Sequence, residues 1–195
     1  MTPHLVTMPV TGAIADAVDI IVNKNIGGIP ITDAEGELKG IVTERDVMKV
    51  LATENSGRKA EDIMNSSVRV TGPDTPIGKV CREMVKCRFR RFPVVADDVL
   101  CGIVTATDIM SYLGKGKAFE QLTTGGDSIE VMGGVPVRSL LSGGELHTIT
   151  PDRNIHEIAL EMIRRRVGGA LPVIEDSHLV GLVTEYDLVK AFSEE

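Results

Sequence analysis

The chain has 195 residues and a formal net charge of −7 at pH 7, and these two quantities already exclude several classes of protein. Nucleic-acid binding usually needs a basic face and aromatic stacking platforms, whereas this acidic chain has two tyrosines, four phenylalanines and no tryptophan. No apolar run reaches the roughly 18 residues of a membrane helix, and residues 1–10 lack the features of a signal peptide, so we expect no membrane contact and a cytoplasmic location.

Residues 1–52 predict five elements in the order strand, helix, strand, strand, helix. Apolar residues recur on one face of the first helix, which is typical of a helix that packs on a core. The polar stretch 52–60 then indicates a linker. The predicted elements are a strand at 5–7, a helix capped by Thr11 and ended by Gly27-Gly28, strands at 29–32 and 38–43, and a helix at about 44–51.

Residues 60–113 repeat this order after a short lead-in segment, 60–64, that residues 1–52 lack. Strands are expected at 68–71, 92–95 and 100–105. The helix between them has Thr75 as its N-cap and Pro76 at its first helical position, where proline is favoured. The apolar stripe of this helix is formed by Ile77, Val80, Met84 and Val85.

A glycine-rich stretch, 114–134, precedes a third copy at 135–195. Its centre, 118–122, predicts a short helix inside a surface loop. The third copy has its own lead-in at 136–141 and a strand near 146–149. Its helix carries the clearest signal in the chain, because Asn154 and Glu157 form a capping-box pattern and apolar residues follow at helical spacing.

One seven-residue phrase occurs in each copy: a glycine, two apolar β-formers and Thr-x-x-Asp. The pattern predicts a short buried strand that runs directly into a helix N-terminus. A proline stands 13, 12 and 12 residues before the three threonines, and this near-constant spacing indicates an internal repeat. The phrases are Gly40–Asp46, Gly102–Asp108 and Gly181–Asp187, and the prolines are Pro30, Pro93 and Pro172.

The Thr-x-x-Asp motif admits two roles. In the structural role, the threonine caps the helix and the aspartate accepts a hydrogen bond from the backbone N–H of the cap. In the functional role, the aspartate binds the diol of a ribose at about 1.5–3 kcal/mol per charge-assisted hydrogen bond, and the helix N-terminus favours a phosphate. The two roles are compatible, and together they describe a nucleotide site.

Basic residues are concentrated before the second copy of the phrase. In an acidic protein such a cluster indicates a small anionic ligand, and Arg90-Arg91 stand at the mouth of the strand-to-helix corner. The alternative is a solvated helix end whose arginines complement the helix dipole. The cluster puts six of the 21 Lys and Arg residues into 13 positions: Lys79, Arg82, Lys86, Arg88, Arg90 and Arg91.

The sequence contains no catalytic constellation. Its three cysteines form no Cys-x-x-Cys pair, and its four histidines have no partner at metal-ligand spacing. It also lacks a nucleophile elbow, a P-loop and a G-x-G-x-x-G after a strand. We therefore predict a protein that is not an enzyme and has no catalytic residue, no catalytic cofactor and no metal.

The repeats resemble cystathionine β-synthase (CBS) domains, the regulatory units that pair into Bateman modules. The resemblance rests on the strands that contain Pro-Val or Pro-Ile, on the repeated Thr-x-x-Asp phrase and on Asp62-Ile-Met64. The resemblance covers nearly the whole chain. The chain looks most like archaeal four-repeat proteins that are similar to the γ subunit of AMP-activated protein kinase. The resemblance implies an α+β fold of tandem repeats, with an adenine nucleotide (AMP, ADP or ATP) as the regulatory ligand between repeats.

Carried over by position, the resemblance implies three sets of ligand contacts. Ribose hydroxyls would bind Asp46, Asp108 and Asp187. Ribose or phosphate would be approached by Thr43, Thr105, Thr184, Arg90 and Arg91. The adenine base would be held by Val70, Thr71, Phe92, Pro93, Thr148, Ile149, Ala170, Leu171 and Pro172. Repeats 1 and 3 have Gly-Gly where repeat 2 has Arg-Arg, so their own phosphate contacts stay open.

The repeats are assigned to 1–52, 60–113 and 135–195, with 114–134 as the linker. In the four-repeat relatives this linker joins the two halves of one module, so we expect repeats 2 and 3 to form the complete module. Repeat 1 would then expose an apolar sheet face, which predicts a homodimer through repeat 1. The regulated protein target is unknown. Two alternatives stay open: an oligomerisation or scaffold module without nucleotide, and S-adenosylmethionine as the ligand.

Overall fold

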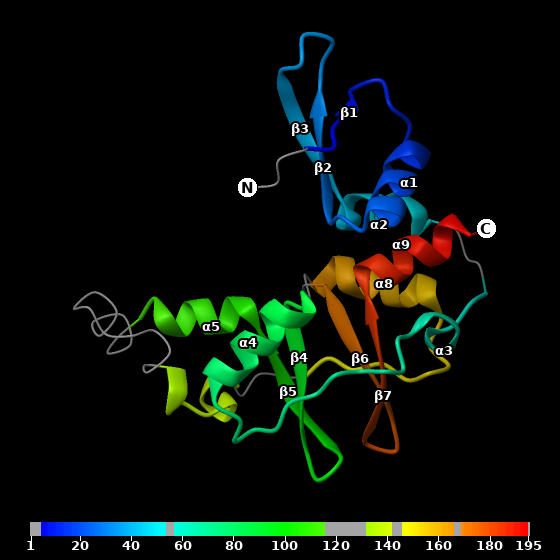
Figure 1. Cartoon of the computed structure of the whole chain (residues 1–195). Helices are drawn as coiled ribbons and strands as arrows, with labels where there is room; N and C mark the ends of the chain where they lie inside the picture. Colours follow the sequence, from blue (N-terminus) through cyan, green and yellow to red (C-terminus); the bar gives the residue numbers. More distant parts are fainter. Residues whose placement is uncertain (1–4, 54–56, 116–131, 142–145, 166–168, 195) are drawn as a thin grey trace. The chain divides into compact units, whose positions relative to one another are not determined.

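The computed structural model describes residues 5–53, 57–115, 132–141, 146–165 and 169–194 (Figure 1). The linker helix predicted at 118–122 lies outside these residues. Helices and mostly antiparallel strands are mixed along the chain, which confirms the predicted α+β class. The chain divides into two compact units: the first comprises residues 1–66, 148–174 and 180–195, and the second comprises residues 67–147 and 175–179.

Repeat 1 forms the predicted order of elements within the first unit. The middle strand of its sheet is β2, which is parallel to β1 and antiparallel to β3. The strand predicted at 5–7 is found slightly later, at β1. The elements are β1 (Met8–Pro9), α1 (Ile14–Lys24), β2 (Gly28–Thr32), β3 (Leu38–Thr43) and α2 (Glu44–Leu51).

Both ends of α1 differ from the prediction. The N-cap is Ala13 instead of Thr11, because the Asp16 carboxylate reaches back and accepts a hydrogen bond from the Ala13 N–H at 2.9 Å. At the other end, Asn25 takes the left-handed conformation with φ 51° and ends the helix before Gly27-Gly28. Asparagine tolerates that conformation better than most residues, and the glycine pair is therefore not needed as the cap.

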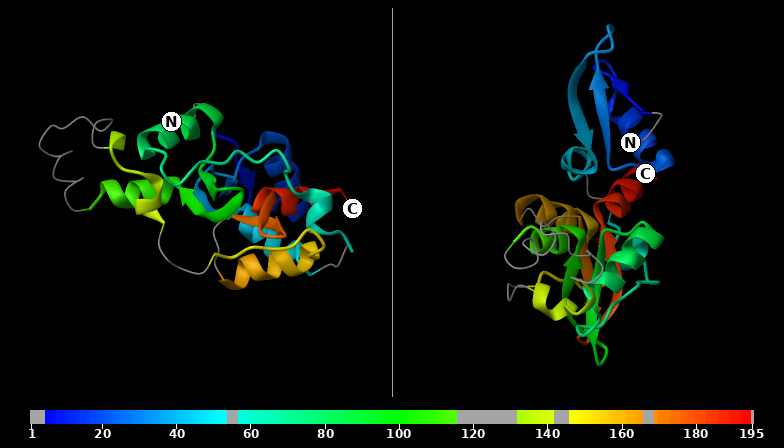
Figure 2. Two further views of the ribbon diagram at one scale, coloured as in Figure 1. Left: turned by 90° about the horizontal axis from the view of Figure 1, so that it is seen from below. Right: turned by 60° about the vertical axis from the view of Figure 1, so that its left-hand side comes forward.

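Most of repeat 3 and the lead-in of repeat 2 complete the first unit. Helices α1, α2, α8 and α9 bury their apolar faces in one core, and α9 lies beside α1 and α2 (Figure 1 and Figure 2). Each large apolar side chain buried there contributes about 1.5–3 kcal/mol. The added elements are α3 (Ala60–Ile63), α8 (Ile155–Arg165), β6 (Ala170–Glu175), β7 (His178–Thr184) and α9 (Glu185–Ser193).

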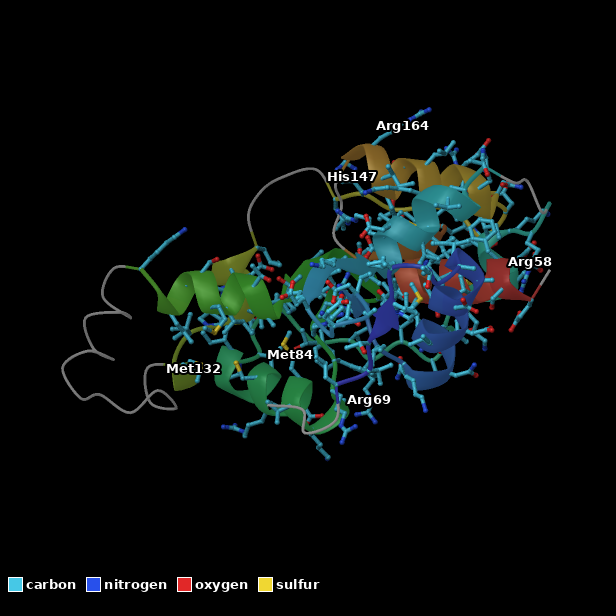
Figure 3. The ribbon with its side chains drawn as sticks, turned by 90° about the horizontal axis from the view of Figure 1, so that it is seen from above. Arg58, Arg69, Met84, Met132, His147 and Arg164 are labelled. Atoms are coloured by element: carbon cyan, nitrogen blue, oxygen red, sulfur yellow. The ribbon has the colours of Figure 1, made fainter. Side chains whose placement is uncertain are left out.

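Repeat 2 and the lead-in of repeat 3 form the second unit. Strands β4 and β5 pair antiparallel, and Val99 of β5 also pairs with His178 at the tip of the β6–β7 hairpin. Met84 projects from α4 into the core between α4 and α5 (Figure 3). The elements are α4 (Ile77–Cys87), β4 (Arg91–Ala96), β5 (Val99–Thr105), α5 (Ala106–Leu113) and the 3-10 helix η1 (Val137–Leu140).

Two details of α4 differ from the prediction. The N-cap is Pro76 rather than Thr75, so the helix begins one residue later than expected. The sequence predicts Val85 in the apolar stripe, yet its side chain is 80% exposed. The other three members of the predicted stripe are buried, and Val85 lies beyond the edge of the face that they form.

Candidate functional site

All three Thr-x-x-Asp motifs form the predicted strand-to-helix corner. In each corner one aspartate oxygen, Oδ2, accepts a hydrogen bond from the threonine N–H, at 3.2, 2.8 and 2.8 Å in repeats 1, 2 and 3. The threonine hydroxyl donates to the same oxygen at 2.6 Å in every repeat. The structural role of the motif is therefore realised three times. The N-caps of α2, α5 and α9 are Thr43, Thr105 and Thr184, and their partners are Asp46, Asp108 and Asp187.

The other carboxylate oxygen, Oδ1, distinguishes the corners. In repeat 1 the Lys49 ammonium group donates to Oδ1 of Asp46 at 2.9 Å. Within the described ranges no hydrogen bond reaches Oδ1 of Asp108 or Asp187. Because the cap holds these two carboxylates through Oδ2, their Oδ1 atoms are pre-oriented acceptors. The corners of repeats 2 and 3 can bind a hydroxyl group without losing the cap.

Burial separates the corner aspartates further. The enclosure of Asp187 in the protein raises the pKa of its carboxyl group above the ordinary value, although the hydrogen bonds from Thr184 act in the opposite direction. Asp46 is more exposed, and the hydrogen bond from Thr43, followed by that from Lys49, lowers the pKa of its carboxyl group. Folding therefore disfavours the ionised form of Asp187 and favours that of Asp46.

These shifts predict opposite pH dependences for two asparagine variants. A carboxyl group whose pKa is raised by folding contributes stability that is lost as the pH rises through that pKa. Asp187→Asn should therefore gain stability relative to wild type toward neutral pH. A lowered pKa adds stability that is lost as the pH falls, so Asp46→Asn should lose stability relative to wild type toward neutral pH. Thermal unfolding from about pH 3 to 7 measures both trends. Equal signs for the two variants would contradict the prediction.

Arg90 and Arg91 lie beside the corner of repeat 2. The Arg90 carbonyl accepts a hydrogen bond at 2.9 Å from the N–H of Ala106, the first residue of α5, and Arg91 pairs with Thr105 across the β4–β5 ladder. Both residues therefore flank a helix N-terminus, where positive backbone dipoles favour an anion. In repeat 1 the residue that makes the equivalent backbone contact is Gly27, so that corner lacks the two positive charges.

A cavity of about 230 Å³ opens between residues 70–72 and helix α4 of repeat 2. Ligand pockets usually measure about 300–1,000 Å³, so this cavity is large enough for one part of a nucleotide. The sequence predicted a ligand role for only some of the lining residues. For Lys79 and Glu83, the signal that could have identified them is their i, i+4 spacing on a polar helix face. The lining combines the predicted Val70, Thr71 and Phe92 with Gly72, Thr75, Lys79, Val80 and Glu83.

The predicted adenine contacts come together in each unit, but part of their backbone is already engaged. In the second unit, the Thr71 N–H donates to the Pro93 carbonyl and the Thr71 carbonyl accepts from Val95, both at 2.9 Å. In the first unit, the Ile149 N–H donates to the Pro172 carbonyl at 3.0 Å. These single bridges replace the strands predicted at 68–71 and 146–149. Backbone N–H and C=O groups alternate in direction along an extended chain, so those of Val70 and Thr148 point away from these bridges. They are therefore better placed to hydrogen-bond a base. Ala170 and Leu171 are buried in β6.

Arg45 is a residue of the corner region that the sequence did not identify. Its guanidinium group donates from Nε and Nη2 to Oε1 of Glu185, at 2.8 and 2.7 Å. Arg45 stands two residues after the cap of α2, and Glu185 directly follows the cap of α9, so the first unit brings the corners of repeats 1 and 3 close together. The two residues are 140 positions apart, and only their opposite charges within the motif could have suggested the pair.

Three α+β repeats, each with a Thr-x-x-Asp cap where its last strand meets a helix, define a class of tandem-repeat proteins. The chain belongs to the CBS domain family, whose model matches residues 1–53, 60–115 and 137–194. Each of the three matched segments contains one copy of the phrase. The resemblance drawn from the sequence is thereby confirmed.

Relatives of known sequence and structure align with nearly the whole chain. Protein MJ1225 of Methanocaldococcus jannaschii is 31% identical over 195 residues, which are 99% of this chain and 68% of MJ1225. Its crystal structure, described as a candidate archaeal homologue of γ-AMPK, has a TM-score of 0.87 and is covered to 67%. A 33.4 kDa protein from a ribosomal RNA operon of Thermofilum pendens is 29% identical over 174 residues and is covered to 57%. The chain thus spans about two thirds or less of these proteins.

Related repeats also occur inside enzymes. Inosine-5'-monophosphate dehydrogenase of Methanocaldococcus jannaschii is 31% identical over 107 residues, which are 54% of this chain and 21% of that enzyme. The similarity therefore concerns the repeats and a minor part of the enzyme. In the part of this chain that the structure describes, no helix is long and apolar enough to cross a bilayer. The same described residues contain no group of three His, Cys, Asp or Glu side chains that could hold a metal ion.

Proposed function

We propose that this protein is a non-catalytic regulatory module that binds an adenine nucleotide at the corners of repeats 2 and 3 and passes the ligand state to a protein partner. The observation that carries the proposal is the Oδ1 atom of Asp108 and Asp187, which the helix cap orients and which no described residue engages. A ribose hydroxyl is a suitable donor to it. A ligand that prefers one of two states of the module would bias the partner by about 1–3 kcal/mol.

Phosphate is the ligand group that the corner of repeat 2 favours. Arg90 and Arg91 add two positive charges beside a helix N-terminus, which supports AMP, ADP or ATP over a ligand with a sulfonium cation. Two solved structures, with TM-scores of 0.56 and 0.50, are described as CBSX2 in complex with AMP and as the CBS pair of MJ0100 with 5′-methylthioadenosine and S-adenosyl-L-methionine. Both are 20% identical to this chain, so they support the fold and leave the choice of ligand to experiment.

We further propose that repeats 2 and 3 act as one complete module. The support is that the lead-in segment of each of these repeats packs on the other repeat. Each of the two contacts lies within one unit. Met64, from the lead-in of repeat 2, packs on Gly181 of repeat 3, and Leu141, from the lead-in of repeat 3, packs on Gly102 of repeat 2. Asn65 also exchanges two backbone hydrogen bonds with β7, at 3.0 and 3.1 Å. In such a module the strand before each corner depends on a segment of the other repeat.

Repeat 1 has no such cover among the described residues, and we propose that it binds a second copy of the chain. A Cβ at Gly40 would meet no atom within 4 Å, whereas a Cβ at Gly102 or Gly181 would be crowded. Leu38 and Ile41, on either side of Gly40, are 70% and 64% exposed. Of eleven large apolar side chains that are exposed in the described residues, six lie in repeat 1. Gly40 and Ile41 point to opposite sides of β3, so the strand is open on both sides. An exposed apolar strand of this kind supports a twofold contact between two copies of repeat 1.

Light scattering at micromolar concentration tests this association. We expect the mass of two chains for the wild type and of one chain for Ile41→Glu, because a carboxylate in an apolar contact would be buried without a partner. Met110→Glu is the matched control, since Met110 is 67% exposed in the second unit. A wild type with the mass of one chain, or equal dissociation by both variants, would refute the dimer.

Titration calorimetry tests the ligand itself. We expect AMP, ADP or ATP to bind with a Kd in the micromolar range, at about −8 kcal/mol, and S-adenosylmethionine to bind more weakly. Tighter binding of S-adenosylmethionine would assign the corners to that ligand. If none of the four compounds binds, the remaining function is an oligomerisation scaffold in which the Thr-x-x-Asp motifs are helix caps alone.

A further inference from the structure

Helix α4 carries an exposed surface that the proposed nucleotide site does not use. Arg82, Val85 and Lys86 are exposed on one side of the helix, and Phe89 is exposed just beyond its end. Val85 is 80% and Phe89 is 43% exposed, although both residue types are usually buried. Residues at i, i+3 and i+4 are neighbours on a helix, so two cations and two apolar groups share one surface. We call these four residues the α4 stripe.

Phe89 is held in a fixed position. Its N–H donates to the Met84 carbonyl at 2.9 Å, and the Arg88 N–H donates to the Val85 carbonyl at 3.3 Å, a pair of hydrogen bonds that ends a helix with one left-handed residue. Arg88 is that residue, with φ 56°, where glycine is the usual choice. The Phe89 ring also contacts the ring of Phe92, with centroids 6.0 Å apart. A rigid, half-exposed ring loses little entropy on binding, as interface anchors do.

The charge of the α4 stripe is opposite to that of the whole protein. The chain has a net charge of −7, whereas residues 77–91 contain six cations and one acid, Glu83. Arg69 lies 3.7 Å from the Glu83 carboxylate and offsets this acid in turn. A surface with cations around two large apolar side chains is complementary to a ligand that is both acidic and amphipathic.

We infer that the α4 stripe binds an acidic amphipathic segment of a partner protein. Apolar side chains of that segment would contact Val85 and Phe89, while its carboxylates would pair with Arg82 and Lys86. A membrane surface fits less well, because two apolar side chains bury little area and a body of charge −7 is repelled by anionic lipid. A second copy of the stripe would bring like charges together. The inference rests on the proposed function only for the role of the partner, because the binding itself requires no nucleotide.

Fluorescence anisotropy with designed peptides tests the α4 stripe. The probe is a labelled helical peptide of glutamate with leucine at i, i+3, i+4 and i+7, and its two counterparts carry lysine for glutamate or serine for leucine. We expect the glutamate–leucine peptide to bind with a Kd of about 10–100 µM, as small transient interfaces do, and the other two about tenfold more weakly. Equal binding of the lysine and glutamate peptides would overturn the inference.

Matched variants locate the binding on the protein. Val85→Ser and Arg82→Gln should each weaken the binding of the probe about threefold to tenfold. The Tm should change little, because both side chains are exposed. Arg164→Gln is the control, since Arg164 extends from α8 into solvent (Figure 3). An equal effect of the control would overturn the inference. Loss of phosphatidylserine vesicle binding in Arg82→Gln, without any peptide binding by the wild type, would also overturn it and assign the stripe to lipid.

Nucleotide titration of the same variants separates this inference from the proposed function. Val85→Ser and Arg82→Gln should bind AMP as the wild type does, because neither side chain lines the cavity or a corner. Peptide binding without AMP binding would leave the α4 stripe in place and remove the nucleotide. AMP binding without peptide binding would do the reverse.

Discussion

Alanine in place of Asp108 or Asp187 is expected to weaken adenine nucleotide binding at that corner by about 10- to 150-fold. Each of these carboxylates has one oxygen in the helix cap and one oxygen open to a ribose hydroxyl, and a hydrogen bond to a charged group contributes about 1.5–3 kcal/mol. Titration calorimetry with AMP measures the loss. Asp46→Ala is the matched control, because Lys49 already engages the second oxygen of Asp46, and its effect should stay within about twofold.

Stability has to be measured beside affinity, because the same aspartates cap their helices. Loss of a cap costs about 0.5–2 kcal/mol, so all three alanine variants are expected to lower Tm by a few degrees. Asp108→Asn and Asp187→Asn keep an oxygen that accepts from the threonine N–H, so they should retain most of that stability. Their affinity for the nucleotide should still fall. If the affinity falls equally in all three repeats and in proportion to stability, the motif is a helix cap and the proposed site is wrong.

The corners could be predicted from the sequence because their signals are local. Seven residues specify the strand, its end and the first turn of the helix, and all three copies form the expected corner. The strand of repeat 1, β3, is mostly exposed instead of buried as predicted. Local signals also compete, and there the prediction failed. Thr11 is a better cap by residue type than Ala13, yet Asp16 binds the Ala13 N–H and decides where α1 begins. The side chain that completes a cap thus outweighs the type of the cap residue.

The differences among the corners could not be predicted, because they depend on packing. Lys49 and Lys190 each stand three residues after a corner aspartate, at Asp46 and Asp187. Lys49 binds its aspartate at 2.9 Å, whereas Lys190 lies 3.9 Å from Glu194 and leaves Oδ1 of Asp187 open. The two sequences are alike at this position, and only the surroundings of the helices separate an occupied oxygen from an available one. The exposure of Val85 on α4 has the same kind of origin.

Valine at the three phrase glycines is expected to have unequal effects, although the sequence makes these positions equivalent. A Cβ at Gly181 would lie 2.8 Å from Cγ and 3.1 Å from Cβ of Met64, so the lead-in has to move and Gly181→Val should cost about 1–3 kcal/mol. Gly102→Val should cost less, since the Leu141 methyl group at 2.8 Å can rotate away. Gly40→Val should leave the stability unchanged or slightly raised, because β3 is extended and open there.

Thermal unfolding of the three valine variants measures this order, and one double variant identifies its cause. Met64→Ala removes the crowding atoms, so the double variant with Gly181→Val should lose less stability than the sum of the two single losses. Gly40→Val is measured over a range of protein concentrations. If Gly40 lies in a contact between two chains, the valine would obstruct that contact and lower the Tm only at concentrations where the wild type is dimeric. Equal losses at all three positions would mean that the glycines serve the strand itself. The expected order would mean that the same glycine receives a neighbouring lead-in in repeats 2 and 3 and leaves that place open to a second chain in repeat 1.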